Sequence, residues 1–345
     1  MCPIKRLLPS RTTPELAYLC ARHGATGSYR SAAAVVSALT SVSCLSHMRV
    51  RRETIKIGEY IEDRQFALGW GSDSQCEERA KSLSMAIDST VVTAYPFEEI
   101  SKFEVLAGRI EREGRMTRRF ACAIPRRILA RVLVSAALKQ CGWSPSTFVD
   151  VVNDGASGMR SLVTQIAPRV ASPMLDWFHL AMKLHAIRSS LFSRNYFLPR
   201  PEIFSRCEKI WRKIREALWR GRAAIGIELT RTLAASMKEE ALKRESFYGP
   251  AAATTFGAAN RLLIFLQHNA AILVDYARAR RAGRRISTAP AESVMNHLIN
   301  RRLSKRQQMR WSINGAHYLL QARVELLDGK LEEQFICKYP HFRSP

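Results

Sequence analysis

Three acidic side chains, far apart in the sequence, stand where catalytic carboxylates are often found. Asp88 lies in the alternating run SLSMAIDSTVV, Asp154 follows the β-branched run TFVDVV, and Glu292 stands near the expected start of a helix. Open α/β sheets bind ligands at the carboxyl ends of their strands, which is where Asp154 falls. Three converging carboxylates stay ionised only with a cation, and oxygen ligands select Mg²⁺ or Mn²⁺. If three such carboxylates meet in the fold, they would hold two ions about 4 Å apart, and such ions assist in-line attack on a phosphodiester.

Each of these acids also has an ordinary structural interpretation. Asp-Gly after a strand is most often a turn, and Asp88 could be an exposed strand residue. Glu292 follows Pro290 in a first helical turn, where the helix dipole favours a carboxylate in any case. The catalytic interpretation depends on the three acids occurring together on the expected elements. Gly155 is expected to allow a sharp turn or a close approach beside Asp154.

A second acid ends the next expected strand. Asp176 follows Pro173-Met174-Leu175, and His179 comes three residues later. We expect a structural hydrogen bond between the two side chains, with a zinc site as the lesser alternative.

The charge of the chain predicts a polyanionic partner. Its 345 residues include 54 Lys and Arg against 30 Asp and Glu, a net charge of +24. Nucleic acid is the commonest partner for such an excess, although basic ribosomal and membrane-surface proteins share it. The residues expected to contact DNA are Arg49, Arg51, Arg52, Arg284, Arg285, Arg301, Arg302, Lys305, Arg306 and Arg310. Trp311, which follows them, is expected to pack in the core, and a solvated basic helix is the alternative for the last five.

Composition excludes several other classes of protein. Apolar content of 47% and aromatic content of 8% are those of a globular protein. The most apolar run, 128–138, is too short to span a membrane, and the first residues lack the apolar core of a secretory signal. Eight cysteines without a C-x-x-C pair favour buried thiols over zinc or disulfides. We therefore expect a cytoplasmic protein.

The hydrophobic periodicity predicts an α/β fold that is interrupted by helices. Residues 13–62 indicate three helices, the last one basic, which suits a helix-turn-helix DNA module or a helical cap, and 63–80 indicate a polar linker. Strands are expected at 82–92, 102–111 and 118–124, then a helix at 126–140, a strand at 147–152, a helix near 159–166 and a strand at 173–175. Helices are expected at 181–192, 201–219, 223–242 and 258–279, followed by one that opens near 287 and one at 312–327. The expected order is βββαβαβ, a mixed sheet with helices on its faces.

The acids on these elements have the layout of the RNase H-like nucleases. The blocks AIDSTVV, FEVLAGRIE, NDGASGMRSL, LDWFHLAMKL and AESVMNHLINRRLSKRQQMRWSINGAHYLLQAR resemble, in order, bacterial insertion-sequence DDE transposases of the branch related to Mutator-like elements. The likeness covers roughly residues 12–343, and its last block is the most specific. Relatives usually carry a further N-terminal segment, so the resemblance also implies a shortened copy.

The resemblance implies a domain plan and a function. Residues 1–80 would be a helical DNA-binding region and linker, 81–180 the first part of an RNase H-like core, 181–286 an all-helical insertion, and 287–345 the glutamate helix and a C-terminal helix. The triad would be Asp88, Asp154 and Glu292, and Asp176 with His179 the strand-end motif. The implied function is transposition of double-stranded DNA by a nucleoid-associated homo-oligomer. The alternatives are an RNase H-like nuclease or resolvase without strand transfer, and an inactive DNA-binding remnant.

Overall fold

The structure, a computed structural model, divides into two compact units. It describes residues 12–345 except 43, 71–77, 96–99, 113–115, 125–126, 156–161, 163–164, 167–170, 193–200, 244–248, 304–309 and 344–345. The first unit comprises Met1–Val149, Ser161–Val170 and Pro290–Pro345, and the second comprises Asp150–Arg160 and Ala171–Ala289. The two compact units therefore group the chain differently from the four expected segments, since the N-terminal helices share a unit with the first strands.

The expected meander and the two strands after it form one mixed five-stranded sheet. Its strands are β1 (Ser82–Thr93), β2 (Lys102–Arg112), β3 (Met116–Ile124), β4 (Phe148–Asn153) and β5 (Ala171–Leu175). The strand order is β3-β2-β1-β4-β5, and β2 pairs antiparallel with both β1 and β3. Each β-branched or alternating run therefore became the strand that its period indicated, and the α/β class is confirmed. Most of the helix expected near 159–166 lies outside the described residues.

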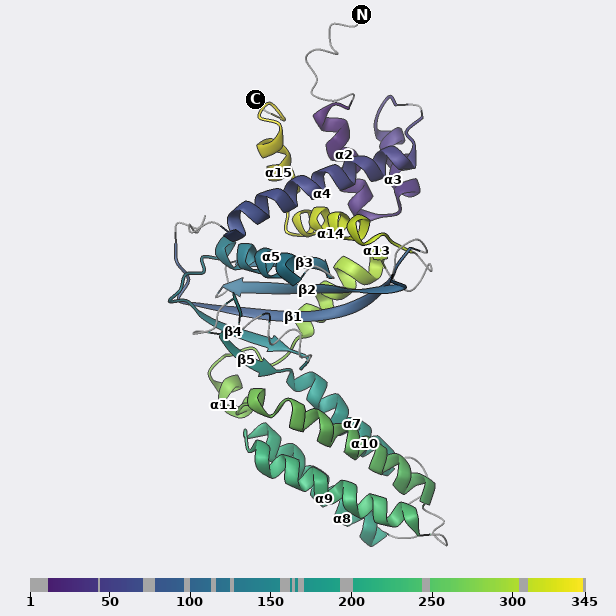
Figure 1. The fold of residues 1–345 in the computed structure, drawn as a ribbon, viewed down its shortest axis with the longest axis vertical. Coiled ribbons are helices and arrows are strands. Elements are labelled where there is room, and N and C mark those ends of the chain that lie inside the picture. The colour runs from purple at the N-terminus through teal and green to yellow at the C-terminus, as the bar shows by residue number, and fades with distance from the viewer. Residues whose placement is uncertain are drawn as a thin grey trace, which may run out of the picture. The chain divides into compact units, whose positions relative to one another are not determined.

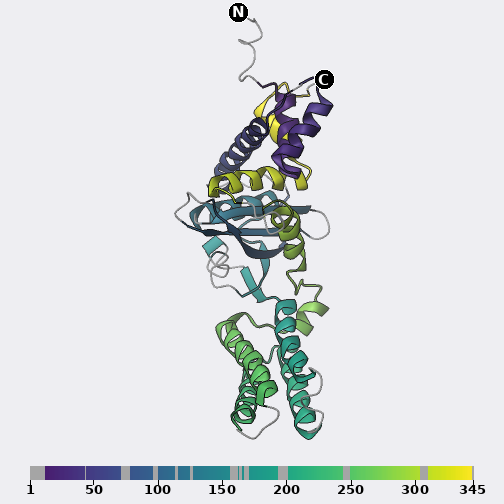
Figure 2. The same cartoon turned by 90° about the vertical axis from the view of Figure 1, so that its right-hand side faces the viewer.

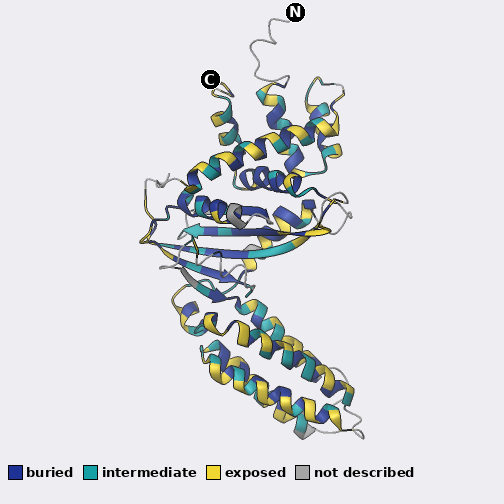
Figure 3. Ribbon diagram, in the orientation of Figure 1, coloured by how far each residue is buried: buried dark blue, intermediate teal, exposed yellow. Residues whose placement is uncertain are grey.

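Helices cover one face of the first unit's strands in layers. α5 (Arg127–Gln140) and α14 (Ile313–Leu327) pack on β3 (Figure 1). α14, mostly dark blue in Figure 3, is buried along nearly its whole length because α4 (His47–Trp70) covers its other side. Figure 2 shows the same succession of strands, α14 and α4 from another direction. Gly58 permits this close crossing, because a Cβ there would lie 2.0 Å from the backbone oxygen of Tyr318.

Three helices form the N-terminal region, as the sequence predicts. α2 (Pro14–Thr26) and α3 (Tyr29–Leu39) begin at the N-caps Thr13 and Ser28, whose side chains accept backbone N–H bonds. The prediction of a linker from residue 63 is wrong, since α4 continues to Trp70. The reason is tertiary: the Lys139 amino group donates hydrogen bonds of 3.0 Å to the carbonyls of Leu68 and Gly69 and so caps the end of α4.

The second unit is dominated by helices that run side by side (Figures 1 and 2). They are α7 (Trp177–Phe192), α8 (Pro201–Trp219), α9 (Ala223–Leu242) and α10 (Gly249–His268), followed by a 3₁₀ turn (Ala270–Ile272) and α11 (Tyr276–Arg281). The single helix expected at 258–279 is therefore wrong. α10 ends at His268, and a separate helix, α11, begins after Asp275, whose side chain accepts the Arg278 N–H as its N-cap. Leu262, Leu266 and Tyr276 are buried among the packed helices.

The last part of the chain returns to the first unit. α12 (Ala289–Met295) continues into a π-helical turn (Asn296–Asn300) and the short α13 (Arg301–Leu303), and α15 (Leu331–Lys338) follows α14. Among the described residues, no helix is long and apolar enough to cross a membrane. Cys20, Cys122, Cys141 and Cys207 are buried free thiols, as expected, whereas Cys44 and Cys337 are exposed.

Candidate functional site

Asp88 lies in β1, the strand between β2 and β4 in the strand order. Its partner across the β1–β2 ladder is Ala107. The preceding residue, Ile87, is fully buried, while Asp88 is half-buried. One carboxylate oxygen accepts the Ser89 N–H at 2.7 Å, which limits the rotation of the side chain. The strand therefore holds this carboxylate at a fixed position with part of its surface open to solvent.

Asp154 lies in a tight turn directly after β4. The fully buried Asn153 accepts the Gly155 N–H through its side-chain oxygen at 2.9 Å. Gly155 has a φ of 94°, and a Cβ there would come within 2.8 Å of the Asn269 side-chain oxygen. Both observations confirm the expectation that a glycine is needed here. The half-buried Asp154 is thus held between two constrained neighbours.

Glu292 lies in the first turn of α12 and is half-buried. The helix is fixed from its other end, where the Nε of buried Arg323 on α14 donates to the Leu298 carbonyl at 2.9 Å. Leu298 belongs to the π-helical turn that follows α12, and such turns are frequent at functional sites. Burial lowers the pKa of Arg323 to about 10. Glu292 therefore stands on an anchored helix, as a positioned ligand would.

The three carboxylates predicted to bind metal are divided between the two units. Asp88 and Glu292 belong to the first unit, and Asp154 belongs to the second. Within the described parts of the chain, no group of three or more His, Cys, Asp or Glu side chains is placed to hold a metal ion. Their convergence therefore stays a prediction. Their chemistry suits a hard cation, because all three offer only oxygen.

Asp176 and His179 form the hydrogen bond that the sequence predicts. The His179 Nδ1 lies 3.1 Å from an Asp176 oxygen, and the Thr288 hydroxyl donates to the same oxygen. The other oxygen caps α7 by accepting the Phe178 N–H at 2.7 Å. Burial alone would raise the pKa of Asp176, but these hydrogen bonds outweigh it and hold the pKa below its ordinary value. Asp176 is fully buried and engaged on both oxygens, which supports the structural role.

Replacing Asp176 by Asn is expected to lower the free energy of unfolding near neutral pH by about 1–3 kcal/mol, because an amide nitrogen would face groups that donate. The folded-state pKa of Asp176 lies below its ordinary value of 3.8, so its stabilisation is present above pH 3.8 and is lost as the pH falls through the folded-state pKa. Urea unfolding at decreasing pH should therefore show the difference between wild type and variant shrinking below pH 3.8. A difference that stays constant at every pH would contradict this role.

The predicted DNA-contacting residues divide into several environments. Arg284 is already paired within the second unit, where its Nε donates to Asp150 at 2.9 Å. Arg49 donates to the Thr12 hydroxyl at 3.0 Å. Arg52 and Arg301 are exposed, and Arg285 is half-buried. Lys305 and Arg306 lie outside the described residues. The predicted residues therefore include side chains that are already engaged within the protein as well as exposed ones.

Three of the predicted residues, however, line one pocket of the first unit. Arg51 on α4, Arg302 on α13 and Arg310 surround it together with Tyr29 and Trp311. Trp311 is only 8% exposed, as its expected packing role requires, and it pairs with the end of β1 through an isolated bridge to Ala94. Arg302 was expected at the surface but is only 3% exposed. Sequence reasoning missed Tyr29, whose part in the pocket depends on contacts between distant segments.

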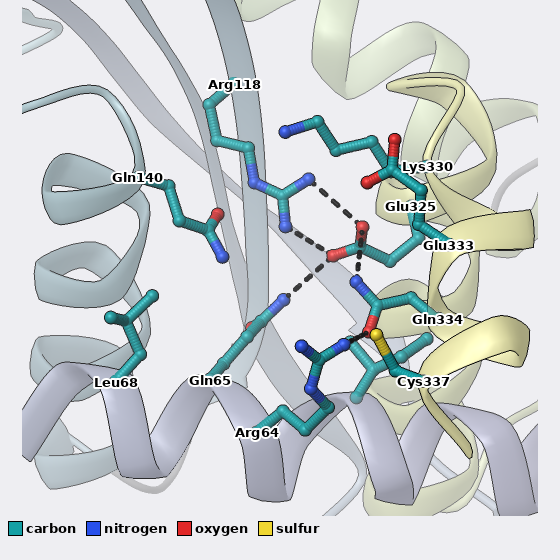
Figure 4. A pocket seen from close by; sticks show the side chains of 11 residues that line it. Arg64, Gln65, Leu68, Arg118, Gln140, Glu325, Lys330, Glu333, Gln334 and Cys337 are labelled. Carbon is teal, nitrogen blue, oxygen red and sulfur yellow. Dashed lines mark hydrogen bonds and ion pairs between the residues drawn. The ribbon is translucent and has the colours of Figure 1, made fainter. Parts of the chain in front are cut away.

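A second pocket of the first unit contains an ion network that the sequence did not reveal (Figure 4). Arg118 on β3 is 1% exposed, and its guanidinium donates to Glu325 and, at 3.0 Å, to Asp328. Gln65 and Gln334 also donate to Glu325, each at 3.2 Å. Burial alone would lower the pKa of Arg118, but the two carboxylates raise it above its ordinary value. Because these charges satisfy one another, the network is structural and binds β3 to α14.

No protein-family model matches the chain, and no curated protein matches it.

Proposed function

We propose that this chain is a DNA transposase with an RNase H-like core interrupted by an all-helical insertion. It would hydrolyse a phosphodiester bond at each transposon end and then join the freed 3′-hydroxyl to target DNA. The proposed partner is double-stranded DNA, bound by a homo-oligomer in the bacterial cytoplasm. The sequence blocks that resemble insertion-sequence transposases support this proposal, as does the net charge of +24.

The strand order β3-β2-β1-β4-β5 is the single observation that carries the proposal. A three-stranded meander followed by a helix and two further strands is the order expected for an RNase H-like core. In that order β1, which bears Asp88, is next to β4, after which Asp154 comes. The helical segment α7–α10 then separates β5 from α12, which carries Glu292, as the resemblance implies.

Different residues of this chain would have different roles in the proposed reaction. Asp88, Asp154 and Glu292 would hold Mg²⁺ or Mn²⁺, because all three are half-buried carboxylates on fixed elements. Two such ions, when bound, activate a water molecule or a 3′-hydroxyl as the nucleophile and balance the negative charge on the scissile phosphate. Asp176 is left out of this ligand set, because His179, Thr288 and the Phe178 N–H occupy its oxygens. The exposed arginines would hold the DNA backbone.

Purified protein and labelled duplex DNA from the flanks of its reading frame test this function. Mg²⁺-dependent nicks followed by products joined to a second duplex are expected. Nicks without joined products would replace the proposal by a nuclease or resolvase. A mobility shift without either reaction would replace it by a DNA-binding remnant. Absence of any DNA binding would contradict all three.

A further inference from the structure

The pocket beside Trp311 has the composition of an anion site with aromatic walls. Its volume is about 480 Å³, within the range of small-ligand pockets. Arg51, Arg302 and Arg310 supply three guanidinium groups, and Tyr29, Tyr95 and Trp311 supply three aromatic rings. Among the described residues that line it, none is acidic. Every charged group there thus carries the same sign, which favours a negatively charged occupant.

Arg302 lacks the partner that a buried guanidinium requires. It is 3% exposed, and its Nε, Nη1 and Nη2 atoms have no hydrogen-bond partner in the part of the chain that the structure describes. Its neighbours are rings instead: the guanidinium carbon lies 4.7 Å from the centre of Tyr29 and 4.9 Å from that of Trp311. Burial lowers the pKa of Arg302, because the charged guanidinium is removed from water. Buried polar groups are normally satisfied, and this one needs an acceptor.

Two further donors at the same place are also unsatisfied. The Tyr29 hydroxyl and the Trp311 Nε1 are buried without a hydrogen-bond partner among the described residues. A guanidinium, a phenol and an indole N–H that all lack an acceptor belong to residues that line this one pocket, and such donors favour an oxyanion such as a phosphate. The rim is more open, with Tyr95 48% exposed and Arg310 exposed. Exposed aromatic rings beside a phosphate site are where bases stack.

We infer that this pocket binds one unpaired nucleotide of a DNA strand, with its phosphate on Arg302 and its base against the aromatic wall. This inference depends on the proposed function only in taking DNA as the ligand. Tyr95 donates its backbone N–H to the Trp311 carbonyl at 2.9 Å, so the wall of the pocket continues from the end of β1, the strand that bears Asp88. Arg302 follows the segment that carries Glu292. Two of the proposed catalytic segments therefore lead to the pocket.

A binding experiment with two duplexes of equal length tests the inference. One duplex is fully paired, the other has unpaired nucleotides at one end, and a chelator prevents cleavage. In fluorescence anisotropy, wild-type protein is expected to bind the frayed duplex about tenfold more tightly, as stacking of a single base allows. Arg302→Met should abolish this preference, whereas Arg301→Met, at an exposed neighbour outside the pocket, should weaken the binding of both duplexes by the same factor and so leave their ratio unchanged. Equal affinities in the wild type, or a preference that survives in Arg302→Met, would overturn the inference.

Loss of folding cannot explain the expected result. Replacing a buried, unpaired charge by an apolar side chain of similar length is expected to keep or raise the melting temperature, which is measured in parallel. Arg310→Met at the exposed rim provides a second variant and should weaken the preference. A deoxynucleoside monophosphate that displaces the frayed duplex at similar concentrations would make this a free-nucleotide site and overturn the assignment to a DNA strand.

The outcome also separates this inference from the proposed function. The binding preference requires no cleavage. A protein that prefers frayed ends through Arg302 but does not cut DNA would support the nucleotide-binding pocket and contradict the proposed transposase function. A protein that cuts and joins DNA with no preference for unpaired ends would support the transposase function and contradict the nucleotide-binding pocket.

Discussion

Replacing Asp154 by Asn is expected to reduce Mg²⁺-dependent DNA cleavage by at least about a thousandfold, the loss typical of catalytic groups that act as a unit. The turn that holds residue 154 depends on Asn153 and Gly155, so the variant should fold like the wild type. The amide removes one negative charge and one strong cation ligand without changing size. Single-turnover cleavage of an end-labelled duplex measures the effect.

The matched control for this variant is Asp63→Asn, the same chemical change at an exposed position of α4. It should cleave at the wild-type rate. Both variants should bind the duplex at least as tightly as the wild type, because each removes a negative charge from a basic protein. Cleavage by Asp154→Asn within tenfold of the wild type would contradict the assignment of Asp154.

Replacing Arg118 by Met is expected to lower the free energy of unfolding by about 3–5 kcal/mol, the usual result of removing one partner of a buried ion pair. Glu325 is fully buried, and Gln65 and Gln334 alone would then face its charge. The network joins β3 to α14, so its loss should unfold the contact between sheet and helix. Urea unfolding followed by circular dichroism measures this change.

Two comparisons show whether the buried charge is the cause. The double variant Arg118→Met with Glu325→Met should recover most of the stability, because no unpaired buried charge then remains: Asp328 keeps its ion pair with Arg119 at 2.6 Å. Arg212→Met removes an exposed pair with Glu208 on α8 and should change stability by about 0.5 kcal/mol or less. A loss for Arg118→Met as small as that for Arg212→Met would mean that the network does not support the fold.

Elements whose signal is local were predictable from the sequence. The alternation around Asp88 gave β1, and α8 and α9 begin and end at the predicted residues. The hydrophobic period and the boundary residues of these segments lie within the segments themselves, so contacts with the rest of the chain are not needed to predict them. The turn at Gly155 belongs to the same class, because an Asp-Gly pair after a strand restricts the backbone directly.

Features that depend on distant contacts were not predictable. The end of α4 lies beyond the predicted boundary because Lys139, far along the chain, caps it. The burial of Arg302 and Arg118 likewise depends on aromatic rings and carboxylates from other segments, and an arginine in a basic run carries no sign of this. The candidate acids were identifiable by type and position, but Asp154 belongs to a different unit from Asp88 and Glu292, so no local signal in the sequence could show whether they meet.

The central claim is that Asp88, Asp154 and Glu292 together bind divalent cations. Its most direct test is to measure Mn²⁺ binding by electron paramagnetic resonance in the presence of a DNA duplex. The wild type is expected to bind Mn²⁺, and Asp88→Asn, Asp154→Asn and Glu292→Gln should each weaken that binding, while Asp63→Asn leaves it unchanged. Mn²⁺ binding that is absent from the wild type, or that none of the three substitutions alters, would contradict the account.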